Sequence, residues 1–177
     1  LGTEQSGHMM MVGYELYCKL VDDAVRELSG AAMEAPAQET SVELPVEALV
    51  PSSYIEDELL KLQIYKKIAS IRDERDRSEV IDELLDRFGD LPRPVLNLID
   101  IAGIKAAAQK AGITRVREEQ KKLIFEFEQM SRLHPEAMAD LAGSYGMGML
   151  IHGGKHPYLR VAPKTGDRLS EALAFLT

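Results

Sequence analysis

Few side chains in this sequence have the types and spacing of a reactive site. Gly153-Gly154-Lys155-His156 places a lysine after two glycines, but it lacks the spacing and the hydroxyl residue of a phosphate-binding loop. The residues on either side alternate as strands do, so a hairpin turn is expected. His152 and His156 have the four-residue spacing of zinc ligands on a helix, but the glycines between them and Pro157 exclude a helix. We therefore expect turn histidines and no metal site.

The single cysteine, Cys18, falls near the apolar stripe of a helix expected over residues 14–29. No histidine is visibly paired with it, so we expect it to pack as a small hydrophobic side chain and not to act as a nucleophile. One cysteine also excludes an internal disulfide, which fits a reducing compartment. The chain has no apolar run of about 18 residues and no secretory leader. These features predict a cytoplasmic, non-catalytic protein. Because the sequence begins with Leu1 and not with Met, we also expect it to be a piece of a larger protein.

The most informative pattern is an acidic stripe on one predicted helix. At about 100° per residue, its acids fall within roughly a third of the helix circumference: Glu79, Asp82, Glu83, Asp86 and the trailing Asp90. The apolar residues lie opposite and are expected to be buried: Ile81, Leu84, Leu85 and Phe88, with Val80 at their edge. Like charges at these spacings repel one another. Two interpretations stay open: a solvated helix face, or a docking surface for a basic partner.

The elements that must position this stripe follow from periodicity and from turn residues. Helices are predicted over residues 14–29, 56–71, 76–88, 94–111 and about 135–144, with a last helix capped by Asp167. Asp76-x-x-Glu79 resembles a capping box that opens the acidic helix, and Gly89 is expected to end it. Strands are predicted over residues 41–44, 114–118, 123–128, 149–152 and 158–161, the last four as two hairpins. This order predicts an α+β fold, with helices packed on a small antiparallel sheet built of hairpins and with an N-terminal helical segment.

The charge of the chain is unevenly distributed. Its net charge is −8, and residues 31–56 contain five glutamates and no lysine or arginine. Residues 91–177 contain twelve lysines and arginines and nine acids. Non-specific DNA binding needs clustered cations, so an acidic chain is better suited to a basic protein surface. An alternative stays open, in which the basic last half contacts nucleic acid through Lys105, Lys110, Arg115, Arg117, Lys121 and Lys122.

Three stretches of the sequence resemble one known family. The first is L-G-T-E-Q-S-G at 1–7, followed by V-G-Y-E-L-Y-C-K-L-V-D-D-A-V at 12–25. The others are I-Y-K-K-I-A-S-I at 64–71 and E-L-L-D-R-F-G-D-L-P at 83–92. The first is similar to the segment that ends the translocase motor of transcription-repair coupling factors, and the other two resemble the C-terminal domain of that family. The order and spacing of these stretches also fit, so the resemblance covers essentially the whole chain.

The resemblance implies a domain layout. Residues 1–30 would be the tail of a translocation motif, shaped as a helical hook, which Gly2, Gln5, Ser6 and Gly7 match. Residues 31–40 would be a linker, and residues 41–177 a C-terminal regulatory domain. The parent protein would be a bacterial ATP-driven DNA translocase that displaces stalled RNA polymerase and recruits UvrA. Its ATP and magnesium site would lie upstream of Leu1, so no cofactor is expected in this chain.

The resemblance also implies a partner and an interface. In the family, the C-terminal domain folds back on the parent's own N-terminal UvrB-like module and covers its UvrA-binding surface, which is autoinhibition. Glu83 and Asp86 match the acidic positions of that interface, and Asp82 and Glu79 share the same helix face. UvrA and RNA polymerase would then be indirect partners. No membrane is implied, and no DNA contact is expected of this fragment alone.

Overall fold

The computed structural model describes residues 40–129 and 135–176, with the side chains of residues 135–138 left aside. The described residues divide into two compact units, which we treat separately. The helical unit comprises residues 45–103, and the sheet unit comprises residues 40–44 and the described residues from 104 onward. The predicted helix over 14–29, Cys18, almost all of the predicted linker and the translocation-motif residues lie outside the described residues.

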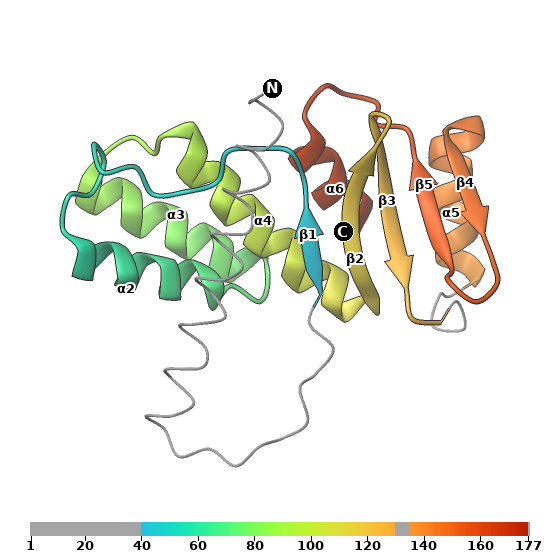
Figure 1. Ribbon diagram of the computed structural model, residues 1–177, viewed down its shortest axis with the longest axis horizontal. Helices are drawn as coiled ribbons and strands as arrows, with labels where there is room; N and C mark the ends of the chain where they lie inside the picture. The colour runs from blue at the N-terminus through green and yellow to red at the C-terminus, as the bar shows by residue number, and fades with distance from the viewer. Residues whose placement is uncertain (1–39, 130–134, 177) are drawn as a thin grey trace, which may run out of the picture. The chain divides into compact units, whose positions relative to one another are not determined.

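The helical unit contains α2 (Glu58–Ala69), α3 (Glu74–Phe88) and most of α4 (Arg93–Lys110), whose last residues belong to the sheet unit. Helices α2 and α3 lie side by side (Figure 1). Their apolar faces join α4 and the preceding loop in one core, formed by Val50, Ile55, Ile64, Ile68, Ile71, Val80, Leu84, Val95, Leu98, Ile99 and Ala102. The predicted helices are therefore confirmed to within about two residues at each end.

Helix α3 begins earlier than the sequence predicted. Asp73 is the N-cap residue, and its carboxylate accepts a hydrogen bond from the Asp76 backbone N–H at 3.0 Å. The Asp76 carboxylate in turn accepts from the Arg72 backbone N–H at 2.9 Å. The predicted capping box from Asp76 to Glu79 is therefore wrong, because the extended Asp73 offers a cap one turn upstream. Gly89 ends the helix with a positive φ of 79°, as predicted.

The sheet unit contains a five-stranded sheet in the order β1-β2-β3-β5-β4 (Figure 1). Its strands are β1 (Ser41–Glu43), β2 (Ile113–Glu119), β3 (Lys122–Phe127), β4 (Met149–His152) and β5 (Tyr158–Val161). Strands β2 and β3 pair as an antiparallel hairpin, and so do β4 and β5. Both predicted hairpins, and the α+β class, are confirmed.

One strand departs from the predicted antiparallel sheet. Strand β1 pairs in parallel with β2, with Val42 opposite Val116, so the sheet is mixed. The whole helical unit lies in the chain between these two strands. A connection of that length permits a parallel crossover, whereas a hairpin turn would force an antiparallel pair.

Two helices cover one face of this sheet: α5 (Pro135–Tyr145) and α6 (Arg168–Leu176), both behind it in Figure 1. The Phe175 ring of α6 stacks on Phe125 of β3 with the ring centroids 4.3 Å apart. Asp167 caps α6 as predicted, since its carboxylate accepts from the Leu169 backbone N–H at 3.1 Å. The sheet core therefore lies between β3 and these helices.

The rotational setting of α3 can be tested with two neighbouring leucines. Leu84 has no exposed surface, whereas Leu85, predicted to be buried, is 48% exposed. We expect Leu84→Ala to lower the free energy of unfolding by about 2–5 kcal/mol, because it leaves a cavity in the core. Leu85→Ala should lower it by about 0.5 kcal/mol or less. Urea denaturation of both variants measures the difference, and equal losses would contradict this setting of the helix.

Candidate docking face on helix α3

The exposed side of α3 is defined by an ion pair on its buried side. Arg77 bonds to the Asp100 carboxylate of α4, with Nη2 2.6 Å from Oδ1. Arg77 therefore belongs to the buried arc together with Val80 and Leu84. The prediction located the buried face of α3 from its apolar residues alone. That placed the centre of the buried arc too close to Leu85, so Leu85 was wrongly predicted to be buried.

The four predicted interface acids share α3, but they do not share one environment. Glu79, Asp82 and Asp86 are exposed, whereas Glu83 is half-buried on the flank that faces α2. Asp90 follows the end of the helix and is not part of its surface. Three of these acids are thus exposed on α3, and the predicted stripe is divided at Glu83.

Glu83 is held by two basic side chains. Lys67 of α2 contacts one of its carboxylate oxygens, and Arg87 Nη1 lies 3.0 Å from the other. These hydrogen bonds, first the one from Lys67 and then the one from Arg87, lower the pKa of Glu83 from its ordinary value. Glu83 is therefore an ionised link between two helices of the unit.

The other acids of the predicted interface are held less firmly than Glu83. Glu79 pairs with Arg75 at 3.0 Å, but both side chains are well exposed, and such pairs contribute little. Within the described ranges, Asp82 and Asp86 make no ion pair. Leu85 is exposed on the same side, one residue before Asp86 and three after Asp82. We call Asp82, Leu85 and Asp86 the α3 docking face: an apolar side chain beside two exposed carboxylates.

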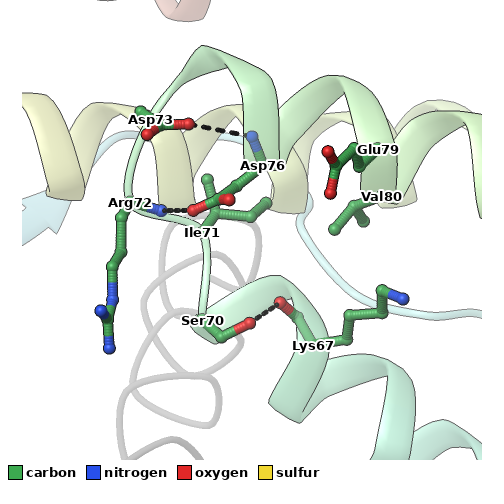
Figure 2. Close-up of a pocket in the computed structure, with 8 residues that line it drawn as sticks. All are labelled: Lys67, Ser70, Ile71, Arg72, Asp73, Asp76, Glu79 and Val80. Carbon is green, nitrogen blue, oxygen red and sulfur yellow. Dashed lines mark hydrogen bonds between the residues drawn. The ribbon is translucent and has the colours of Figure 1, made fainter.

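A hollow of about 450 Å³ lies where α2 ends and α3 begins. It is lined by Lys67, Ser70, Ile71, Arg72, Asp73, Asp76, Glu79 and Val80 (Figure 2). Its carboxylates at Asp73 and Asp76 already accept backbone hydrogen bonds that shape the turn. No nucleophile with an adjacent base lines it, so it carries no evident chemistry.

Some of the basic residues predicted for the alternative nucleic-acid contact are held in ion pairs within the sheet unit. The Arg115 guanidinium bonds to Glu43, with Nε 2.8 Å from Oε1. Arg117 bonds to Glu126 at 2.7 Å and to Glu119 at 2.8 Å. Two of the six proposed cations are thus paired with carboxylates, which weakens this alternative.

His152 lies in strand β4. His152 stacks on Tyr158 with the ring centroids 4.7 Å apart. No group of three acids, histidines or cysteines in the described part of the chain could hold a metal ion. None of the described helices is both long and apolar enough to span a membrane.

The family described as the TRCF domain matches residues 44–138, which is more than half of the chain. The chain belongs to the TRCF domain family. It is 38% identical to the transcription-repair-coupling factor of Escherichia coli K12 over 139 residues, which are 76% of this chain and 12% of that protein. It is 37% identical to the protein of the same name from Staphylococcus epidermidis over 144 residues, which are 81% of this chain and 12% of that protein.

A solved structure agrees with this assignment. The crystal structure of the C-terminal domain of a transcription-repair coupling factor matches 78% of this chain and 91% of that chain, with a TM-score of 0.67 and 26% sequence identity. This chain spans about an eighth of the length of the curated relatives that it matches. The resemblance read from the sequence is confirmed.

The Glu83 link should make the stability of the TRCF domain dependent on pH. Because its folded-state pKa is lowered, ionised Glu83 stabilises the fold above its unfolded-state pKa of about 4.3. That contribution is lost as the pH falls through the folded-state pKa. We expect Glu83→Gln to lower the free energy of unfolding by about 0.5–1 kcal/mol at pH 7, and by progressively less on acidification.

Urea denaturation between pH 7 and pH 3 measures this effect. Glu79→Gln is the matched control, since its pair with Arg75 is exposed and should contribute almost nothing. A difference between Glu83→Gln and the unmodified chain that stays constant with pH would show that the Glu83 link does not depend on its charge.

Proposed function

We propose that this TRCF domain is a non-catalytic regulatory part of a bacterial, cytoplasmic DNA repair translocase. It docks on the parent protein's own UvrB-like module and masks the surface that UvrA binds. It binds no cofactor, and ATP and magnesium belong to a motor upstream of it. UvrA and RNA polymerase bind other parts of the parent protein and are indirect partners of this domain. The names of the relatives support the repair context, and the α3 docking face supports a docking role.

The observation that carries this proposal is the exposed Leu85 beside two carboxylates, Asp82 and Asp86, that make no ion pair within the described residues. Exposed ion pairs contribute roughly 0.2–1 kcal/mol each, so Asp82 and Asp86 together supply a weak and salt-sensitive attraction. Burial of Leu85 adds an apolar anchor of the kind that central interface residues provide. A total of about 1–2 kcal/mol biases a tethered latch roughly five- to thirtyfold, which keeps it reversible.

Calorimetry of this chain with the separately produced UvrB-like module tests the proposal. We expect binding that weakens at high salt and that Asp82→Lys with Asp86→Lys abolishes. Glu128→Lys with Asp140→Lys is the matched control, because it makes the same charge change at exposed acids of the sheet unit. Equal losses in both double variants would assign the effect to net charge and contradict docking through α3.

Lys67 gives a second prediction. Glu83 matches the family's interface motif, yet in this chain Lys67 already holds it. If a basic group of the partner also contacts Glu83, Lys67 competes with that group. We expect Lys67→Met to tighten binding about two- to fivefold. The same calorimetry measures it, and unchanged affinity would leave Glu83 a purely internal link.

A further inference from the structure

The two edges of the sheet differ in how they are protected. Strand β1 forms one edge, is three residues long, ends at the ion-paired Glu43, and is followed closely by Pro45. Short length, charge and proline are the means by which proteins prevent edge strands from pairing with other chains. Strand β4 forms the other edge, and its sequence, M-L-I-H, has neither an acid, a lysine or arginine, nor a proline.

The backbone of β4 has donors and acceptors that point outward. The Ala162 N–H donates to the Gly148 carbonyl at 2.8 Å, and these residues are opposite one another just before β4 and just after β5. Bonded pairs alternate along an antiparallel ladder, so Leu150 and His152 bond to β5. The N–H and C=O groups of Met149 and Ile151 therefore point away from the sheet.

The side chains of β4 are open on both faces. Leu150 is 42% exposed and Ile151 is 48% exposed, and they lie on opposite faces because side chains alternate along a strand. With Met147 just before the strand, this segment contains three of the five large apolar side chains that are exposed in the described part of the chain. An edge of this kind suits an added strand that supplies apolar side chains of its own.

The charge around this edge indicates the kind of strand. Residues 141–166 contain no aspartate or glutamate, although the chain contains 29 of them. Arg160 of β5 lies opposite Leu150, and it has no ion pair within the described residues, whereas Arg115 and Arg117 are paired with glutamates. At the tip of the hairpin, Lys155 and His156 are exposed.

We propose that β4 is an acceptor strand for an extended acidic peptide segment of a partner protein. The segment pairs with the outward backbone groups of Met149 and Ile151. Its carboxylates lie on the face of Arg160, and its apolar side chains lie beside Ile151. The added strand lies about 10 Å from β5, and arginine and glutamate side chains together span that distance over Leu150. This proposal does not depend on the α3 docking face.

The probe is a fluorescein-labelled heptapeptide of alternating valine and glutamate, titrated by fluorescence anisotropy against the 177-residue chain. A valine–lysine heptapeptide tests charge, and a valine–glutamate peptide that is N-methylated on the side facing β4 tests strand pairing. We expect only the unmodified acidic peptide to bind. Equal binding of either control would overturn the proposal.

Two variants locate the site. Ile151→Pro removes only an outward N–H, so β4 keeps its bonds to β5, and we expect about a tenfold loss of affinity. Arg160→Gln should cost about two- to fivefold and remove the preference for glutamate over lysine. Unchanged affinity in both variants would place the peptide elsewhere.

Two further measurements start from the unmodified chain. Amide hydrogen exchange of the unmodified chain should slow at Met149 and Ile151 when the acidic peptide is added, and no slowing would contradict strand pairing. Analytical ultracentrifugation of the chain alone should show a monomer. A dimer that Ile151→Pro dissociates would show that a second copy, and not an acidic peptide, occupies this edge.

Discussion

The Arg77–Asp100 ion pair determines how the helical unit presents its surface. Asp100 is largely buried in α4, and a carboxylate there needs a partner because an unpaired buried charge is strongly unfavourable. Arg77 supplies that partner from α3, next to the apolar core that Leu84 enters from the same helix. The helix is therefore fixed in rotation, and everything on its far side follows from this setting. Leu85 is exposed for this reason and not because the helix lacks a core to bury it in.

The same setting separates acids that are close in sequence. Glu83 faces α2, where Lys67 contacts it, and Arg87 of α3 pairs with its other oxygen, whereas Asp82 and Asp86 are exposed and make no ion pair within the described residues. Adjacent carboxylates thus acquire different roles, one that joins two helices and two that are available to a partner. A family motif read only as a row of acids does not make this distinction.

Features that depend on neighbouring residues could be predicted from the sequence, whereas features that depend on contacts between distant residues could not. Asp167 and Gly89 act through bonds and backbone angles of their own helices, so the sequence predicted them correctly. The parallel pairing of β1 depends on residues about 70 positions away, such as Ile113, whose carbonyl accepts from the Thr40 hydroxyl. The exposure of Leu85 depends on Asp100, which no helical periodicity of α3 includes. The acidic stripe was predictable from helical periodicity, but its division at Glu83 depends on the position of Lys67.

The two proposed surfaces rely on different physics, and this difference bears on regulation. The α3 docking face relies on exposed charge and one apolar side chain, so its strength follows salt and tether length. Strand β4 relies on backbone hydrogen bonds, which salt affects little, and on Arg160 in a stretch of sequence without acids, which supplies only selectivity. The first surface lies in the helical unit and the second in the sheet unit. A segment that binds β4 and a partner of the α3 docking face would therefore contact different residues, and we expect salt to weaken the second interaction more than the first.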